Sequence, residues 1–329
     1  MKYLLIDTAN TFFRARHSAH RQSDTWDKLG FALHVTLTSI QKVWREQKAD
    51  HVVFCFEGRS WRKDFYEPYK KNRSVARAAL TETEQEEDRL FWEAFDNLKK
   101  FIFDNSNCTA LQHNELEADD LIAGWIQNHT DDDHIIVSSD TDFYQLLANN
   151  VKQYNGITDE LHTLEGIFNR KGDRVIDKKT KEPKVIPNPE WLLFEKCMRG
   201  DTSDNVFSAY PGVRTRGTRN KVGLQEAFED RHNKGYNWNN LMLQRWIDHN
   251  EQEHRVLDDY QRNRILVDLT AQPDDVKTNI TETVNVGKVQ KTNPQIGTKF
   301  LKFCGKYQLN KVSEQASGVA DFLSAPYPQ

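Results

Sequence analysis

The sequence has few cysteines, and their spacing supports neither a disulfide framework nor a zinc site. Its 329 residues include only four, and all of them are far apart. No Cys-x-x-Cys pair occurs, although that spacing is usual in zinc ribbons and redox motifs. We therefore expect reduced thiols and a cytoplasmic protein. The cysteines are Cys55, Cys108, Cys197 and Cys304.

Long apolar stretches are also missing. No run approaches the roughly 20 residues that a membrane-spanning helix needs. The apolar run at the N-terminus already ends at Asp7, which is too early for a secretory signal peptide. These absences predict a soluble protein with no membrane partner.

The chain lacks the excess of positive charge that is common in nucleic-acid-binding proteins, since its formal net charge is −4. The charges are segregated, however, and a local basic surface can act despite an acidic total. Residues 59–77 contain seven Lys or Arg against two acids, and residues 214–221 contain four Lys or Arg and no acid. These two segments are therefore candidates for contact with phosphate groups.

Acidic residues follow three short apolar runs that are typical of buried parallel strands. Asp7 ends the first run, Glu57 follows the second, and Asp140 and Asp142 follow the third. Ligand sites in such sheets lie beyond the carboxyl ends of the strands. Carboxylates gathered there repel one another unless a cation lies between them. The pattern predicts a cation site, whereas the simpler alternative is that Asp140 and Asp142 only cap the following helix.

Two further acidic groups occur beside predicted helices. Glu117, Asp119 and Asp120 lie at the start of an amphipathic helix, and Asp201 and Asp204 follow a helix that begins near Pro189. Acids in a first helical turn are common because they complement the helix dipole. For Glu117, Asp119 and Asp120 the sequence alone therefore leaves two interpretations open: a part of the cation site, or acids that only complement the helix dipole.

The basic segment 59–77 alternates its charges with aromatic residues, a pattern that suits phosphate pairing and stacking on exposed bases. The alternative is a solvated loop with its aromatic side chains tucked underneath. A second basic segment, 210–219, contains two glycines and precedes a predicted helix at 222–229. A helix, a Gly turn and a helix with free amide groups would form a phosphate cradle.

The alternation of apolar runs with amphipathic segments predicts an α/β fold with a mostly parallel central sheet and helices on both faces. We expect an N-terminal α/β domain over residues 1–157 that includes a basic arch at 58–80. A hairpin excursion should occupy 158–188. A C-terminal helical domain should cover 189–329 and carry a helix-turn-helix with the Gly turn near 200–228.

Taken in order, these motifs resemble those of the structure-specific 5′ nuclease (flap endonuclease) family. They are closest to the bacteriophage members known as phage ribonuclease H or 5′-3′ exonuclease. The resemblance covers about residues 3–230, and the Tyr-Lys-Lys-Asn-Arg block at 69–73 strengthens it. Its other motifs are Glu-Gly after the second strand, Glu-Ala-Asp-Asp, Ser-Asp-x-Asp-Phe, and Gly-Asp-x-x-Asp-Asn before the basic turn.

The resemblance implies a metal-dependent 5′-3′ exonuclease and flap endonuclease. Its expected substrates are DNA with 5′ flaps or ends and the RNA of RNA–DNA duplexes. Such an enzyme would remove primers during phage DNA replication in the host cell cytoplasm. The resemblance further implies a monomer that meets a replication single-strand-binding protein or a sliding clamp.

The resemblance also assigns roles to residues. Lys70, Arg73 and Arg77 would be catalytic clamps on the scissile or a neighbouring phosphate. The other basic positions, together with one tyrosine, would bind DNA. They are Arg59, Arg62, Lys63, Tyr69, Lys71, Arg214, Arg216, Arg219 and Lys221.

The acids that match the family pattern would hold two Mg²⁺ ions, with Mn²⁺ as a substitute. Carboxylates with no neighbouring His or Cys favour these hard cations, and a pair of them about 4 Å apart suits phosphodiester hydrolysis. The first ion is assigned to Asp7, Glu57, Asp119 and Asp140. The second is assigned to Asp142, Asp201 and Asp204, with Glu117 and Asp120 acting through water.

The sequence departs from the family pattern at two places. Glu57 stands where relatives usually have Asp, which gives one extra methylene of reach. The turn after Asp204 is longer than the compact form in relatives, which leaves open whether this chain has their monovalent-ion site.

Two other functions fit part of the pattern. A single-strand ribonuclease of the PIN-like class has a comparable acidic cluster, but such chains are short and lack the basic segment and the Gly turn. A non-catalytic DNA-binding replication factor would not need the complete set of acids.

Overall fold

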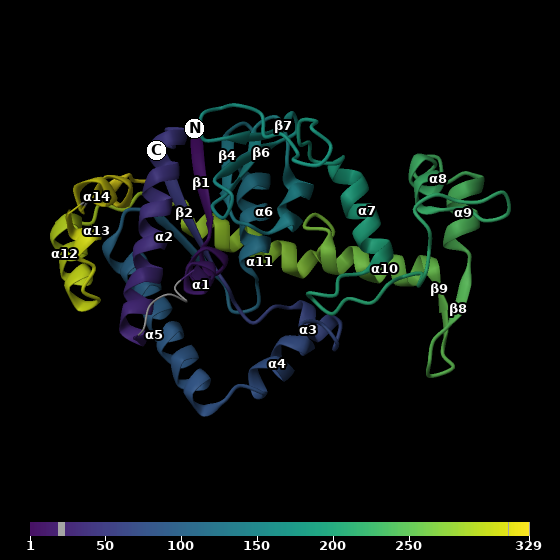
Figure 1. The fold of residues 1–329 in the computed structure, drawn as a ribbon, viewed down its shortest axis with the longest axis horizontal. Helices are drawn as coiled ribbons and strands as arrows, with labels where there is room; N and C mark the ends of the chain where they lie inside the picture. Colours follow the sequence, from purple (N-terminus) through teal and green to yellow (C-terminus); the bar gives the residue numbers. More distant parts are fainter. Residues whose placement is uncertain (19–23, 315, 329) are drawn as a thin grey trace. The chain divides into compact units, whose positions relative to one another are not determined.

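A seven-stranded sheet forms the centre of the computed structural model, which describes residues 1–18, 24–314 and 316–328. The strand order is β3-β2-β1-β4-β5-β6-β7, and the first five strands in this order are parallel. The expected mostly parallel α/β sheet is therefore confirmed (Figure 1). The strands are β1 (Lys2–Asp7), β2 (His51–Phe56), β3 (Thr109–Gln112), β4 (Asp133–Val137), β5 (Val151–Asn155), β6 (Glu160–Thr163) and β7 (Gly166–Asn169).

Helices cover both faces of this sheet. Side chains alternate along each strand, so Leu4 and Ile6 of β1 face one layer while Tyr3 faces the other. The first layer contains α1 (Thr8–Ser18), α2 (Thr25–Gln47) and α5 (Glu82–Asn105), and the opposite layer contains α6 (Ala118–Asn128) and α11 (Asp274–Gly287). α5 begins with a capping box formed by Thr81 and Glu84.

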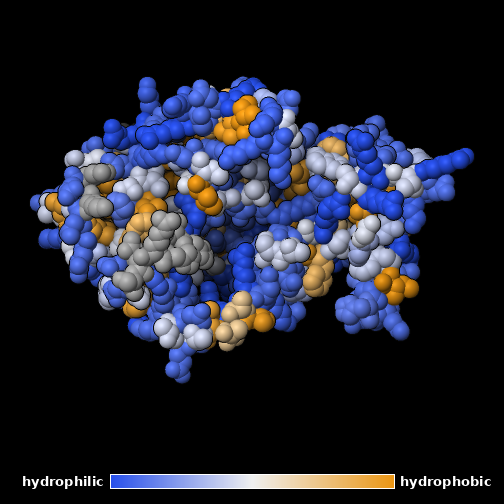
Figure 2. Space-filling model, in the orientation of Figure 1, coloured by the Kyte–Doolittle hydropathy of each residue, from blue (hydrophilic) through white to orange (hydrophobic). Residues whose placement is uncertain are grey.

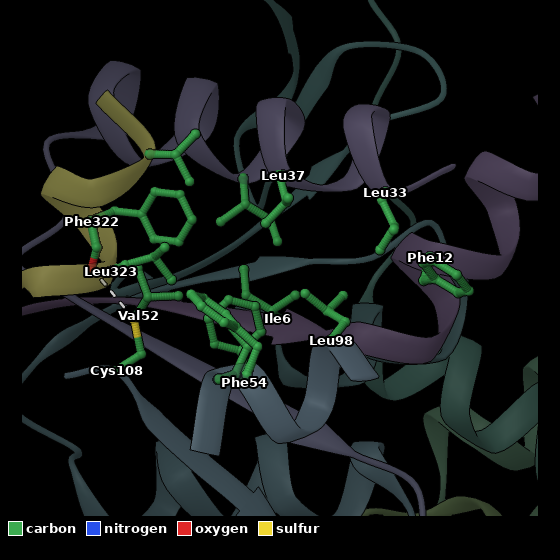
Figure 3. Close-up of a cluster of buried hydrophobic side chains, with 14 of the residues drawn as sticks. Ile6, Phe12, Leu33, Leu37, Val52, Phe54, Leu98, Cys108, Phe322 and Leu323 are labelled. Carbon is green, nitrogen blue, oxygen red and sulfur yellow. Dashed lines mark hydrogen bonds between the residues drawn. The ribbon is translucent and has the colours of Figure 1, made fainter. Parts of the chain in front are cut away.

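The last three helices also pack into the first layer. They are α12 (Ile296–Lys306), α13 (Asn310–Glu314) and α14 (Ala316–Ser324). Phe322 of α14 is fully buried among residues of α2, β2 and α5, and the thiol of Cys108 donates a hydrogen bond to its carbonyl oxygen at 3.4 Å (Figure 3). The residues of the expected C-terminal domain, 189–329, therefore do not form one compact unit, because the segment from Asp275 onward belongs to the α/β unit.

Part of the segment expected as a hairpin excursion, 158–188, forms a hairpin that also extends the central sheet. β6 pairs with β5 and β7 pairs with β6, both in antiparallel register. A turn follows β7, where the Asn169 amide donates a hydrogen bond of 2.9 Å to the Asp173 carbonyl. A β-strand can add to an open sheet edge whenever its backbone groups are free, and turn-rich composition does not reveal this.

A second unit contains residues 61–79 and 187–274. One part of its core joins Phe194 and Met198 to Leu224 and Leu241. The expected helix from Pro189 is present as α7, and the helix expected at 222–229 is present as α8. The elements of this unit are α3 (Arg62–Phe65), α4 (Lys71–Ala78), α7 (Pro189–Arg199), α8 (Leu224–Glu229), α9 (Tyr236–Met242), β8 (Arg245–Ile247), β9 (Glu253–Arg255) and α10 (Val256–Val267).

None of the helices within the described residues is long and apolar enough to cross a membrane.

The packing of α14 predicts a large stability effect at Phe322. We expect Phe322→Ala to lower the free energy of unfolding by about 3–5 kcal/mol, because it opens a cavity in the core of the α/β unit. The control is Leu301→Ala on α12, which removes a side chain that is 48% exposed and should cost less than about 0.5 kcal/mol. Chemical denaturation followed by tryptophan fluorescence measures both. Equal, small losses would contradict the placement of α14 in this core.

Candidate metal centre and nucleic-acid surfaces

The parallel register brings the ends of β1, β2 and β4 to one edge of the sheet. Asp7 is paired with Cys55 in β2, and Ile6 is paired with Val137 in β4. The three strands are neighbours in the order β2-β1-β4. The residues that follow these strands, which include Glu57 and Asp140, therefore emerge beside Asp7.

Asp7 is connected to the end of β4 through Ser138. The Ser138 hydroxyl donates to the Asp7 carboxylate at 2.8 Å and accepts a hydrogen bond from the Asp140 amide at 3.1 Å. Asn10 supports the same link, since its amide donates to Asp7 at 3.2 Å and its side-chain oxygen accepts from the Ser139 amide at 3.1 Å. Asp7 is only 7% exposed, so its carboxylate is held in one position.

Asp140 has the capping role that the simpler alternative predicted. Its carboxylate accepts a hydrogen bond of 2.9 Å from the Asp142 amide, at the start of a 3-10 helix over Thr141–Leu146. This bond engages one carboxylate oxygen. The capping role and a metal-binding role are compatible, because a carboxylate has about four lone-pair positions for hydrogen bonds or a cation.

Glu57 reaches the N-terminus of α6. Its carboxylate accepts a hydrogen bond of 3.1 Å from the Ala118 amide. The next residue, Gly58, allows this approach, because a side-chain carbon there would lie 2.7 Å from the Leu116 carbonyl oxygen. The extra methylene of Glu57 therefore spans the distance from β2 to α6.

Three more carboxylates meet at the same helix end. Ligand atoms of Glu117, Asp119 and Asp120 lie within 4.8 Å of one another. The Asp120 carboxylate also accepts from the Glu117 amide at 3.2 Å, which is a capping interaction. Glu117 and Asp120 are 5% and 0% exposed, so their charges are poorly solvated. Such a group fits a bound cation.

The donors gathered here are oxygen atoms, which suit a hard divalent cation. The nearest thiol is Cys55, and burial together with the charges of Asp7 and Glu57 raises its pKa well above the usual value. The thiol therefore stays neutral at physiological pH, and a neutral thiol is a poor metal ligand. The described oxygen donors are thus suited to a divalent cation.

Two of the remaining acids, Asp201 and Asp204, belong to the second unit and have cationic partners there. Asp204 accepts from Tyr69 at 3.0 Å and from Arg73 at 2.7 Å, and Lys70 lies 3.7 Å away. Two predicted phosphate clamps thus pair with a predicted metal ligand. A cation at Asp204 would have to replace these two side chains.

Asp201 is engaged in a similar way. The Lys196 ammonium lies 2.8 Å from its carboxylate, and the Ser203 hydroxyl donates to it at 2.6 Å. Burial alone would raise the pKa of Asp201, but these partners outweigh it and lower the pKa below its usual value. Asp201 is therefore charged at physiological pH.

Two residues expected on the DNA-binding surface are buried instead, and their predicted role is corrected. Arg62 is 1% exposed, and its guanidinium donates to the Leu266 carbonyl at 2.8 Å. Tyr69 is 4% exposed and donates to Asp204. Trp61 is also buried, at 7%. The tucked-aromatic alternative therefore holds for Trp61 and Tyr69, and these side chains support the basic segment from below.

The other predicted DNA-binding and clamp residues lie at the surface of their own units. Lys71 is paired with Glu67, and the Arg73 side chain is 59% exposed despite its contact with Asp204. The remaining exposed residues are Arg59, Lys63, Arg77, Arg214, Arg216, Arg219 and Lys221.

The expected phosphate cradle in the Gly turn is filled by the protein itself. The Glu226 carboxylate accepts hydrogen bonds from the amides of Gly217 and Gly223, at 3.0 and 2.9 Å. Burial raises the pKa of Glu226, but these amide bonds outweigh it and keep the pKa below its usual value. The amide of Gly217, one of the two glycines in the predicted turn, is therefore not free, which leaves the exposed Arg and Lys side chains of the turn for phosphates.

Comparison with known proteins identifies the family. Residues 2–178 match the model of the 5′-3′ exonuclease N-terminal resolvase-like domain. The chain belongs to the 5′-3′ exonuclease family. The matched range contains every predicted metal-binding acid except Asp201 and Asp204.

Individual relatives are distant. Ribonuclease H of Enterobacteria phage T4 is 26% identical over 282 residues, which cover 79% of each chain. The 5′-3′ exonuclease of Mycoplasmopsis pulmonis is 26% identical and covers 69% of this chain and 68% of its own. DNA polymerase I of Rhizobium leguminosarum is 26% identical over 69% of this chain, which spans only 20% of that polymerase.

Solved structures show the same fold. The T5 5′-exonuclease with bound divalent zinc ions has a TM-score of 0.59 and 19% identity, over 87% of this chain and 99% of that one. The bacteriophage T5 flap endonuclease in a pseudo-enzyme-product complex with DNA and metal ions has a TM-score of 0.57 and 18% identity, over 87% of this chain and 99% of that one.

Sequence reasoning missed the polar residues that hold these acids in place. Gln153 of β5 is buried and donates to the carbonyls of Ser138 and Asp140, at 2.9 and 2.7 Å. Ser138 and Asn10 link Asp7 to the end of β4. A buried polar side chain in a central strand was the available signal, because such groups are nearly always hydrogen-bonded.

The cluster at the start of α6 predicts that Asp119 contributes to cation affinity. We expect Asp119→Asn to weaken Mn²⁺ binding at least tenfold, or about 1.4 kcal/mol, because it removes a charge and retains an oxygen for the Asp120 amide. Asp131→Asn, at an exposed loop position, should change nothing. Isothermal titration calorimetry measures both, and equal affinities in the two variants would reject the site.

Proposed function

We propose that this chain is a metal-dependent 5′-3′ exonuclease and flap endonuclease that hydrolyses phosphodiester bonds of DNA. The observation that carries the proposal is the convergence of carboxylates from the ends of β1, β2 and β4 with those of α6. Membership of the 5′-3′ exonuclease family supports cleavage in the 5′-to-3′ direction.

The proposed cofactor is a pair of Mg²⁺ ions. Asp7, Glu57, Asp119 and Asp140 would hold the first, and Asp142, Asp201 and Asp204 would hold the second. Glu117 and Asp120 would contribute through water. Bound Mg²⁺ would stabilise the negative charge that develops on the attacking and leaving oxygens.

The protein's own residues would position the substrate. Ser138, Asn10 and Gln153 keep Asp7 and the turn at Asp140 in fixed positions, so no reorganisation is needed when charge develops. Lys70 and Arg73 would exchange their carboxylate partner Asp204 for a substrate phosphate, and Arg77 would assist them. Arg59, Lys63 and Lys71 would bind the single-stranded 5′ end.

We also propose that the RNA of RNA–DNA duplexes is a substrate, and that the biological role is primer removal during phage replication. The similarity to a relative named ribonuclease H supports the RNA substrate. A replication single-strand-binding protein or a sliding clamp remains the proposed protein partner.

Cleavage assays test the proposal directly. Wild-type protein should cut 5′-labelled flap, nicked and RNA–DNA substrates in Mg²⁺ and none of them in EDTA. Asp140→Asn should cut at least a hundredfold more slowly, a barrier increase of about 2.7 kcal/mol. The Asn side chain can still cap the 3-10 helix, so the melting temperature without metal should not fall. Cleavage in EDTA, or an unaffected variant, would reject the proposal.

The Gly turn generates a separate prediction about duplex binding. Replacing Arg214, Arg216 and Arg219 with Ala should lower the salt-dependence slope of duplex binding by about 2.7, at about 0.9 per phosphate contact. Binding of a single strand should be retained, because these residues are assigned to the duplex. Fluorescence anisotropy over a salt series in EDTA measures both, and equal losses on the two ligands would rule out a separate duplex surface.

A further inference from the structure

A lysine-rich segment of the first unit has no role in the function proposed so far. Residues 287–313 contain six lysines and neither Asp nor Glu, within a chain of net charge −4. The basic segments already discussed, 59–77 and 214–221, lie elsewhere in the sequence. This segment includes α12.

α12 presents three of these lysines on one side. Its apolar residues, including Phe300 and Cys304, pack into the core of the first unit. Lys299, Lys302 and Lys306 follow at helical spacing, and Lys302 and Lys306 are exposed. The row spans about 10 Å at 1.5 Å per residue. Figure 2 shows mostly hydrophilic residues at the left edge, where Figure 1 places α12.

These lysines have no carboxylate partner among the described residues. Other surface lysines of the same unit do, for example Lys28 with Glu87 at 2.7 Å and Lys99 with Asp96 at 2.8 Å. In contrast, the Lys306 ammonium donates only to the neutral side chain of Asn97, at 3.0 Å. The positive charge of the row is therefore not neutralised internally.

A hollow of about 460 Å³ adjoins the end of this row. It lies between the start of α2 and the turn after α12, and Lys306 and Trp26 both line it. The Trp26 side chain is 56% exposed, which is unusual for an indole ring in a monomeric protein. Asp27 also borders the hollow, so an uncharged group fits there better than a phosphate does.

The start of α2 lies at the same edge of the sheet as the acids that follow the strands. α2 ends at Gln47, shortly before β2 begins at the amino edge of the sheet. Its 23 residues span about 34 Å, whereas a six-residue strand spans about 20 Å. The first turn of α2 therefore extends beyond the carboxyl edge, where Asp7 lies.

We propose that Lys299, Lys302 and Lys306 bind the phosphates of a single-stranded nucleic acid, and that one of its bases stacks on Trp26. Lysines that track a backbone beside an exposed aromatic ring are the usual means of binding single strands. The inference rests on the proposed function for the identity of the ligand. An acidic protein segment could use the same lysines, but it would gain nothing specific from the exposed indole.

The test compares two triple variants. One replaces Lys299, Lys302 and Lys306 with Ala, and the control replaces Lys178, Lys179 and Lys181, which are exposed in a loop of the same unit. Binding of a labelled single strand of 30 nucleotides, a length on the order of two OB-fold binding sites, is measured by anisotropy in EDTA over a salt series. The first variant should lower the salt slope by about 2, at about 0.7 per contact, and the control should keep the wild-type slope.

Variants of the hollow separate stacking from charge. Trp26→Ala should weaken single-strand binding about 5- to 150-fold without changing the salt slope, because it removes no phosphate contact. Trp26→Phe should recover part of the loss. Asp27→Asn should strengthen binding, because it removes a negative charge beside the strand.

Three outcomes would overturn the inference. In the first, the triple variant of Lys299, Lys302 and Lys306 shows the same salt-dependence slope of single-strand binding as the control variant. In the second, Trp26→Ala binds the single strand as tightly as wild type. The third outcome is that a poly-glutamate peptide competes fully and loses affinity only with the lysines, which would assign the surface to an acidic protein. Flap cleavage in Mg²⁺ is measured in parallel. An inactive wild type that still shows the slope change would reject the nuclease proposal alone, and an active wild type without the change would reject this inference alone.

Discussion

The mutual repulsion of carboxylates at one edge of a parallel sheet is the constraint on which the rest of this structure depends. The register of β1, β2 and β4 forces Asp7, Glu57 and Asp140 to that edge, and α6 adds three more acids. The protein accommodates the charge with hydrogen bonds from Ser138, from Asn10 and from the first amides of α6. These bonds fix the carboxylates in place, and the negative charge gathered there suits a divalent cation.

The acids of the second unit have positively charged side chains as partners. Asp201 and Asp204 form ion pairs with Lys196, Lys70 and Arg73. Of the acids proposed for the second metal ion, Asp204 is therefore paired with two of the cations proposed to hold the phosphate, Lys70 and Arg73. An exchange of partners on substrate binding would keep the charges balanced throughout, which costs less than exposing either group alone.

Internal groups also fill positions that a ligand could have taken. Glu226 occupies the glycine amides of the basic turn, and Tyr69 and Arg62 are buried beneath the basic segment. The proposed binding of nucleic acid would therefore depend on long exposed side chains more than on the amides of these glycines. The lysine row of α12 extends the same principle to the first unit.

The sequence by itself determined the three strands that are followed by acids, several of the helices and the order of the acids, because apolar runs, periodicity and caps are local signals. It also determined that Asp140 could be a cap, a metal ligand or both. Tertiary structure decided which residues meet. The partners of Asp204, the burial of Arg62, the addition of β6 and β7 to the sheet and the docking of α14 all join residues far apart in the chain. Long-range contacts of this kind depend on packing and charge balance, and no local pattern of residues encodes them.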